Sequence, residues 1–165
     1  MHVTPDWTIV FNPRTGSRSL AVGLRVAGFQ HVEHAHVRPE QVIGDRVIGV
    51  IRNPVTWVWS FYYTSQMYPL RFEEWLEKFH DKQVGIGWAR PRLNAYHSVI
   101  TDYWLYERGI DGLLAHLGYP NLHFPRRGYK PKPIAPYDVP AIRKYFAEDW
   151  DQYHELLMNQ DYSDR

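Results

Sequence analysis

Short apolar runs alternate along the chain with segments in which apolar residues recur every three or four positions. Residues 7–11 (WTIVF) and 46–51 (RVIGVI) are rich in β-branched and other apolar residues, as buried strands are. Residues 103–106 and 121–124 are two further candidate strands. This alternation predicts an α/β fold, a three-layer parallel sheet flanked by helices, with ligands bound at the carboxyl ends of the strands.

Helical spacing of apolar residues follows each of the first three candidate strands. The expected helices span residues 19–28, 55–66, 71–82, 110–118 and 138–157, and a brief turn is expected at 39–42. Gly28 and Gly118 are typical helix ends, and Asp138 is a typical helix start. Residues 83–94 and 125–136 are expected to be loops, because they combine glycine or proline with basic residues.

Composition limits the kind of protein this can be. A length of 165 residues with 44% hydrophobic residues predicts one domain over residues 1–165. The net charge of +1 argues against a general nucleic-acid binder, so any anion site has to be local. Because there is no cysteine, disulfides, thiolate metal sites and a cysteine nucleophile are excluded. No signal peptide or membrane span is apparent, so a cytoplasmic protein without membrane contact is expected.

The segment after the first strand has the composition of an anion-binding loop. The chain breaks at Asn12-Pro13, turns at Gly16 and restarts as a helix at Ser17 or Arg18. Such a turn directs backbone N–H groups and the positive end of the helix dipole toward one point, where Arg14, Ser17, Arg18 and Ser19 add donors. The alternative is an ordinary turn with a serine cap. Because the pattern G-x-x-x-x-G-K-[ST] is absent, a phosphate-like anion is expected but ATP hydrolysis is not.

A second motif follows the strand at 46–51. Arg52 stands at the carboxyl end of that strand, and Ser60 lies about two helical turns beyond Pro54. In a parallel sheet this end belongs to the same edge as the first loop, so a second anion is expected near the first. The alternative is an arginine ion pair accompanied by a serine in the core.

Together, Pro13-Arg-Thr-Gly-Ser17 and Arg52-Asn-Pro54 with Ser60 resemble the two signature motifs of sulfotransferases that use 3′-phosphoadenosine 5′-phosphosulfate (PAPS). Their style is closest to that of carbohydrate sulfotransferases. The resemblance implies a P-loop nucleotide-hydrolase-like fold, with PAPS as sulfuryl donor and adenosine 3′,5′-bisphosphate as product. It further implies that the loop of Thr15, Gly16, Ser17, Arg18 and Ser19 holds the 5′ phosphosulfate and that Arg14 stabilises the leaving phosphate. Arg52 and Ser60 are implied to bind the 3′ phosphate.

The resemblance extends to Leu105-Tyr-Glu-Arg108, which is similar to the family's strand end before a short helix, and to Lys144–Trp150. By the same resemblance, the basic segment Arg126, Arg127 and Gly128 closes over the 3′ phosphate, and a solvated loop is the alternative. Three features depart from the family's pattern. Many relatives have lysine where Arg14 stands, a basic residue common in the second motif's helix is replaced at Thr56-Trp57, and the chain is shorter than most relatives.

The segment His31-x-Glu33-His34-x-His36 is a candidate source of the catalytic base. In an extended segment His34 and His36 share one face, and imidazole is suited to take a proton from a hydroxyl near neutral pH. Some carbohydrate sulfotransferases have a similar H-x-H ahead of the second motif, so the resemblance implies His34 or His36 as the base. We favour His36, which lies closer to the turn before Pro39, and Glu33 in the same segment is the next candidate. The alternative is surface histidines. Since only two ligands share a face, no metal site is expected.

The resulting hypothesis is a sulfotransferase that moves a sulfuryl group from PAPS to a hydroxyl or amine of a small molecule or carbohydrate, with a histidine as base. A P-loop small-molecule or nucleotide kinase is disfavoured, because the loop has no lysine and no acidic residue closes a strand to hold Mg²⁺. The third hypothesis is a non-catalytic descendant that keeps the nucleotide pocket as a binding module.

Overall fold

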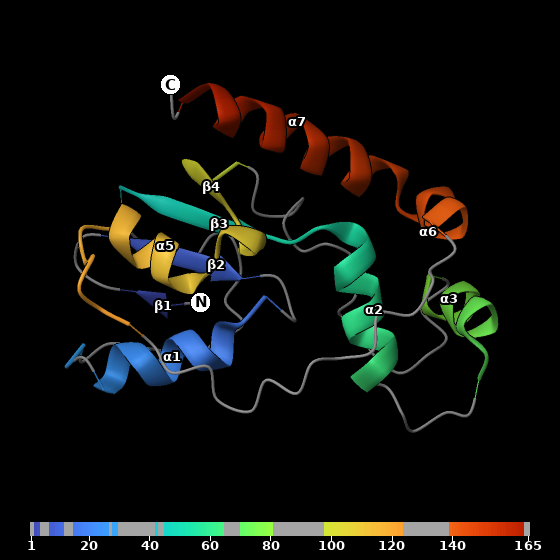
Figure 1. Cartoon of the computed structure of the whole chain (residues 1–165), viewed down its shortest axis with the longest axis horizontal. Coiled ribbons are helices and arrows are strands. Elements are labelled where there is room, and N and C mark those ends of the chain that lie inside the picture. Colours follow the sequence, from blue (N-terminus) through green and yellow to red (C-terminus); the bar gives the residue numbers. More distant parts are fainter. Residues whose placement is uncertain are drawn as a thin grey trace. The chain divides into compact units, whose positions relative to one another are not determined.

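The computed structural model describes residues 2–3, 7–11, 15–26, 28–29, 42, 45–64, 70–80, 98–123 and 139–163. In chain order the elements are β1 (His2–Val3), β2 (Thr8–Phe11), α1 (Ser17–Val26), β3 (Val47–Ile51), α2 (Pro54–Thr64), α3 (Phe72–His80), β4 (Asp102–Leu105), the 3-10 helix η2 (Tyr106–Arg108), α5 (Ile110–His116), α6 (Val139–Tyr145) and α7 (Ala147–Ser163) (Figure 1). Contacts divide the chain into two compact units, residues 1–51 with 93–134 and residues 52–92 with 135–165. One domain over residues 1–165 stays a prediction.

The first unit contains a four-stranded sheet in the order β1-β2-β3-β4. β2, β3 and β4 are parallel, and β1 is an antiparallel edge strand that the sequence pattern did not reveal. The strands expected at 7–11, 46–51 and 103–106 are confirmed with ends shifted by one residue, which establishes the α/β character. Because the parallel strands lie in chain order, the described sheet has no point at which the strand order reverses.

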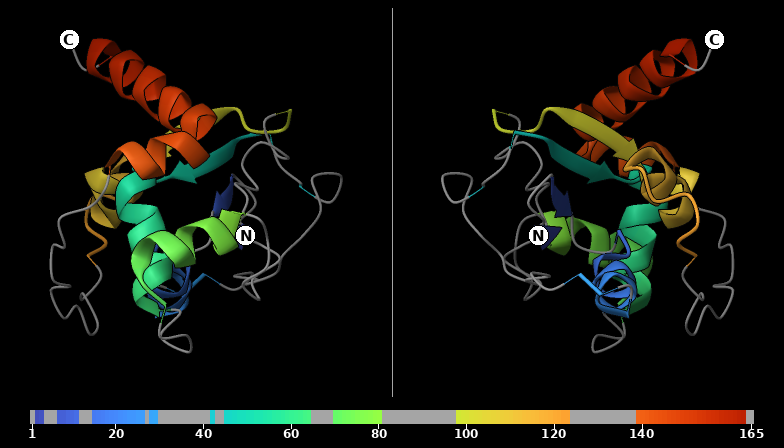
Figure 2. Two further views of the ribbon diagram at one scale, coloured as in Figure 1. Left: turned by 90° about the vertical axis from the view of Figure 1, so that its right-hand side faces the viewer. Right: turned by 90° about the vertical axis from the view of Figure 1, so that its left-hand side faces the viewer.

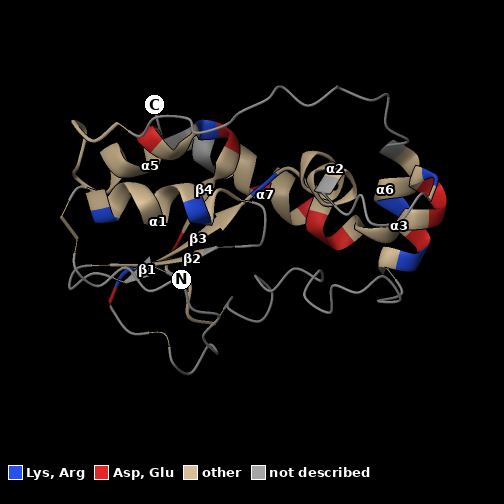
Figure 3. Cartoon of the chain, turned by 90° about the horizontal axis from the view of Figure 1, so that it is seen from below, with Lys and Arg blue, Asp and Glu red and all other residues tan. Residues whose placement is uncertain are grey.

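One face of this sheet is covered by α1 and α5, which lie on the same side of the strands in Figure 3. The shared core combines Trp7, which precedes β2, and the strand residues Ile9, Ile48, Val50 and Trp104 with the helix residues Leu20, Ala21, Leu24, Leu113 and Leu114. On the opposite face, Val10 and Val47 pack with Val42, Val99 and Ile100, none of which is helical. The described part of this unit therefore has one layer of helices, and the third layer stays a prediction.

The strand expected at 121–124 is wrong over its described residues, because 121–123 form a turn and its exit. Gly118, with a φ of 91°, ends the helical segment, and the amide of Tyr119 donates to the carbonyl of Leu114 at 2.8 Å. Tyr119 and Leu122 then pack against the core of the first unit. Their apolar character therefore reflects packing of a loop and not strand pairing.

The second unit is helical and has an aromatic core. α2, α3 and α6 contact one another, and Figure 2 shows them gathered together. The buried residues are Trp57, Val58, Phe61, Trp75, Leu76, Phe79, Ile142 and Phe146. Trp75 stacks on Phe79 with ring centroids 4.5 Å apart, and Trp57 meets Phe61 edge-on at 5.0 Å. Much of the high aromatic content therefore serves core packing.

The final helix, expected as one element over 138–157, is two helices, α6 and α7. Phe146 separates them: its amide donates to the carbonyl of Ile142 at 2.9 Å, and its carbonyl accepts from the amide of Trp150 at 3.0 Å. Apolar spacing continues across this junction, so the pattern by itself predicts no break. The other expected helices are confirmed with shifted ends. No helix in the described part of the chain is both long and apolar enough to cross a membrane.

Replacing Leu24 by alanine tests the packing of α1 on the sheet. Leu24 is 0% exposed, whereas Val22 on the same helix is 42% exposed. Leu24→Ala should lower the free energy of unfolding by about 2–5 kcal/mol, since it leaves a cavity. Val22→Ala should change it by about 0.5 kcal/mol or less. Urea unfolding measures both, and equal losses in the two variants would contradict the packing described for α1.

Candidate phosphate-binding motifs

The loop between β2 and α1 contains the described part of the first motif. Thr15 is fully buried, Gly16 has a φ of 84°, and α1 begins at Ser17. The carbonyl of Gly16 accepts the amide of Leu20 at 3.1 Å, so Gly16 is the cap of the helix. The amides of residues 17–19 precede this first intrahelical bond and point toward the loop. The first turn of α1 has no acidic residue, and Arg18 is exposed there, which suits an anion.

Gly16 is held closely by the segment that follows β4. A Cβ on Gly16 would lie 3.2 Å from Ile110 Cδ1 and 3.3 Å from Tyr106 Cε2, and its positive φ is strained for other residues. Tyr106 belongs to η2 and Ile110 begins α5. β4 therefore ends at Leu105, the short helix η2 follows, and this segment packs against the loop of the first motif. The similarity of Leu105–Arg108 to the family's segment stays a prediction.

The second motif is a capped helix start directly after β3. The side-chain oxygen of Asn53 accepts the amides of Val55 and Thr56 at 3.0 and 3.4 Å, and the Asn53 carbonyl accepts the amide of Trp57 at 2.9 Å. Pro54 occupies the first helical position, where its missing N–H has no cost. The first amides of α2 are thus used by its own cap. An anion at this motif has to be bound by side chains.

Arg52 is half-buried, and its Nε donates to Thr56 Oγ1 at 2.9 Å. The hydroxyl of Thr56 in turn donates to the carbonyl of Asn53 at 3.1 Å. Sequence reasoning did not predict that Thr56 is a hydrogen-bond partner of Arg52. It noted only that a basic residue common in the family is replaced at Thr56-Trp57. The spacing of four residues between Arg52 and Thr56 was the available signal, because such residues meet on one face of a helical turn.

Ser60 lies on α2 and is 2% exposed. This burial is the geometry expected of a core serine, the alternative to a phosphate ligand. Its role toward a 3′ phosphate stays a prediction.

The predicted site residues that the structure describes lie in two different units of the chain. Thr15 to Ser19 belong to the first unit, and Arg52 and Ser60 belong to the second. The remaining predicted residues lie outside the described ranges: Arg14, Glu33, His34, His36, Arg126, Arg127 and Gly128. Within the ranges that the structure does describe, no group of three histidine, aspartate or glutamate side chains could hold a metal ion.

A groove of about 420 Å³ lies between α3 and α6 of the second unit. It is lined by Arg71, Glu73, Glu74, Leu76, Glu77, Ala141, Lys144 and Tyr145. Figure 3 shows acidic and basic positions side by side on these helices. With three glutamates against two cations, the groove does not suit an anionic nucleotide.

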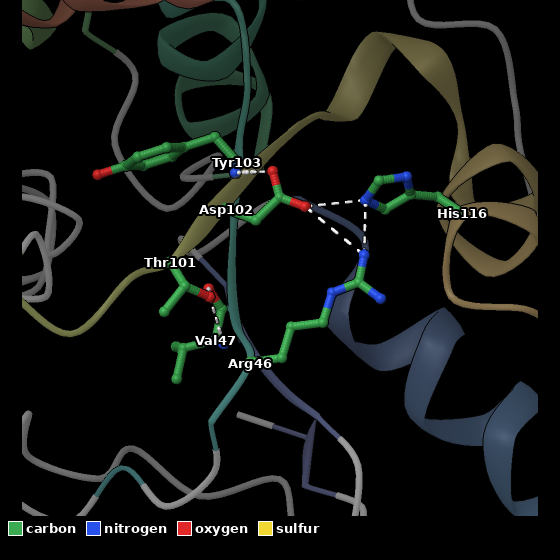
Figure 4. A network of polar contacts seen from close by, with 6 residues as sticks. All are labelled: Arg46, Val47, Thr101, Asp102, Tyr103 and His116. Atoms are coloured by element: carbon green, nitrogen blue, oxygen red, sulfur yellow. Dashed lines mark hydrogen bonds and ion pairs between the residues drawn. The ribbon is translucent and has the colours of Figure 1, made fainter.

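Sequence reasoning also missed a polar network at the amino-terminal edge of the sheet (Figure 4). His116 Nε2 lies 2.8 Å from Asp102 Oδ2 and 3.0 Å from Arg46 Nη2. Nearby, Thr101 Oγ1 accepts the amide of Val47 at 2.8 Å and donates to its carbonyl at 3.1 Å. No motif marks these residues, because they are distant in sequence and meet only where β3, β4 and α5 come together.

The shared ring nitrogen of His116 makes one of these two bonds at a time. A guanidinium can only donate and a carboxylate can only accept, so Nε2 donates to Asp102 when it has a hydrogen and accepts from Arg46 when it has none. In either state the end of α5 is tied to the start of β3 or β4. Burial raises the pKa of the phenol of Tyr103, the residue after Asp102. The network lies opposite the carboxyl ends of the strands, and we interpret it as structural.

No protein-family model, curated protein or solved structure matches the chain. Any argument about function therefore depends on the two motifs and on the described residues around them.

Replacing Gly16 by alanine tests how tightly the loop is held. Gly28 is a matched control, because its φ of 91° is also positive but nothing lies within 4 Å of an added Cβ. Gly28→Ala should lower the free energy of unfolding by about 1–2 kcal/mol through backbone strain. Gly16→Ala should lose about 1–3 kcal/mol more, because the methyl group also crowds Tyr106 and Ile110. Equal losses in urea unfolding would show that these contacts do not constrain the loop.

Proposed function

We propose that this protein is a PAPS-dependent sulfotransferase with a P-loop-like, three-layer α/β fold. One observation carries the proposal: β2 and β3 are adjacent parallel strands paired up to Phe11 and Val50, and one of the two motifs follows each of them. Phosphate ligands of α/β proteins bind beyond the carboxyl ends of such strands. The order and composition of the two motifs supply the rest of the support.

The loop binds the sulfuryl donor through its backbone. Amides of Thr15 to Ser19 and the positive end of α1 hold the 5′ phosphosulfate, which fits a helix start that has no acidic residue in its first turn. Arg14 stabilises the negative charge that develops on the leaving phosphate. The product that remains is adenosine 3′,5′-bisphosphate.

The 3′ phosphate is assigned to Arg52 and Ser60. A guanidinium binds phosphate oxygens through charge-assisted hydrogen bonds, which suits a motif whose backbone amides are already capped. Arg126, Arg127 and Gly128 are assigned to the same phosphate. This assignment distinguishes PAPS from nucleotides that have a free 3′ hydroxyl.

The reaction is an in-line transfer. The acceptor oxygen or nitrogen forms a bond to sulfur while the bond from sulfur to the 5′ phosphate oxygen breaks, and that oxygen keeps the electron pair. His36, or His34 in its place, takes the acceptor's proton. Positioning and charge stabilisation account for the rate, and this scheme requires no metal ion. We propose a small molecule or carbohydrate as acceptor, and a cytoplasmic location, with which a chain without cysteine is compatible.

Nucleotide preference tests the cofactor. Adenosine 3′,5′-bisphosphate should bind about ten- to a hundredfold better than 5′-AMP, because one charge-assisted contact contributes roughly 1.5–3 kcal/mol. Arg52→Ala should abolish most of this preference, whereas Arg71→Ala, at an exposed arginine of the second unit, should keep it. Isothermal titration calorimetry measures each affinity. Equal affinities in the wild type would refute the assignment, and tighter binding of ATP would favour the kinase.

Turnover tests the base. With labelled PAPS and an acceptor found by screening, His36→Ala, or His34→Ala if that residue is the base, should lower the rate by roughly 10²–10⁴ and leave bisphosphate affinity nearly unchanged. A base acts unprotonated, so the wild-type rate should fall as pH drops through an apparent pKa near histidine's usual 6.5 or so.

The acid limb of that profile should vanish in the variant. His116→Ala, in the network at the other edge of the sheet, is the control and should keep the limb. Near-normal rates in both His34→Ala and His36→Ala would move the role to Glu33. Nucleotide binding without turnover of any acceptor would instead support the non-catalytic descendant.

A further inference from the structure

Three groups at the start of α2 form a directional chain of hydrogen bonds. A guanidinium can only donate, so Arg52 Nε gives its hydrogen to Thr56 Oγ1 at 2.9 Å. A carbonyl can only accept, so the single hydroxyl hydrogen of Thr56 goes to the Asn53 carbonyl at 3.1 Å. Each donor and acceptor role is therefore determined by chemistry, and the lone pairs of Oγ1 face Arg52.

This chain restricts how Arg52 can bind an anion. A guanidinium binds two oxygens either through Nε and one terminal nitrogen or through both terminal nitrogens. The first mode needs Nε, which donates to Thr56. Two-point binding that keeps the bond to Thr56 therefore uses Nη1 and Nη2. Holding Nε also reduces the rotamer freedom that the long side chain loses when it binds.

We infer that Thr56 is a positioning residue, which orients Arg52 to bind the 3′ phosphate group of the nucleotide end-on. This inference rests on the proposed function. It explains how the motif works although the basic residue common in the family's second-motif helix is replaced at Thr56-Trp57. Trp57 is 4% exposed and packs in the aromatic core, whereas the hydroxyl of Thr56 turns to Arg52. In this proposal, a well-oriented Arg52 binds the phosphate without help from a second basic residue on α2.

The test compares variants of Thr56 by calorimetry with adenosine 3′,5′-bisphosphate and 5′-AMP. Thr56→Val has nearly the same shape without the hydroxyl, and it should reduce the preference for the bisphosphate about three- to tenfold, as expected for one hydrogen bond. Affinity for 5′-AMP should not change. Thr56→Ser restores the hydroxyl and should restore the preference. Thr101→Val, which removes a threonine hydroxyl bonded to Val47 in the other unit, is the matched control and should keep it.

A double-mutant cycle shows whether Thr56 acts through Arg52. In an Arg52→Ala background, Thr56→Val should have no further effect on the preference, whereas independent contributions would add. Melting temperatures identify any variant that is merely unfolded. If Thr56→Val is unfolded, the preference of Thr56→Ser for the bisphosphate decides whether the hydroxyl orients Arg52. A wild type that shows the preference, with Thr56→Val equal to it, would overturn the inference and leave the proposed function standing. A wild type without the preference would overturn both.

Discussion

The burial of β3 on both faces is the constraint on which the first unit depends. All of Val47–Ile51 is buried, and both edges of the strand pair with parallel neighbours. A register shift of one residue would exchange the two sets of core side chains, so the pairing is strongly specified. The chain therefore leaves the sheet at one edge after each of β2, β3 and β4. The Gly16 loop and the segment of Tyr106 and Ile110 pack together there.

The two motifs start their helices with different caps, and the caps determine which atoms can meet an anion. Gly16 has no side chain to satisfy the first amides of α1, and a Cβ there would be strained by the positive φ and crowd Tyr106 and Ile110. Asn53 satisfies the first amides of α2 with its own side chain. The first motif can thus offer backbone N–H groups, and the second offers a guanidinium.

In the second unit, many aromatic side chains pack in the core and do not form an exposed surface on which a ligand could stack. Consecutive residues on a helix point about 100° apart, so Thr56 and Trp57 face different surroundings. Trp57 fills the core beside Phe61 and Phe146. Thr56 faces Arg52 instead. Two adjacent positions of α2 thus serve different ends, one in the core and one beside the Arg52 guanidinium.

By itself the sequence determined the three parallel strands, most of the helices and the positions of the two motifs, because apolar period, glycine and helix caps act within a few residues. Gly118 as a helix end and Arg52 at a strand end follow from such local signals. Tertiary structure decided the break at Phe146 and the packing of Leu122 without a strand, since a periodic apolar pattern is satisfied equally by several arrangements. It also decided the bond from Arg52 to Thr56 and the meeting of Arg46, Asp102 and His116. The meeting of Arg46, Asp102 and His116 depends on segments far apart in the chain, and the bond from Arg52 to Thr56 depends on side-chain directions that spacing alone does not determine.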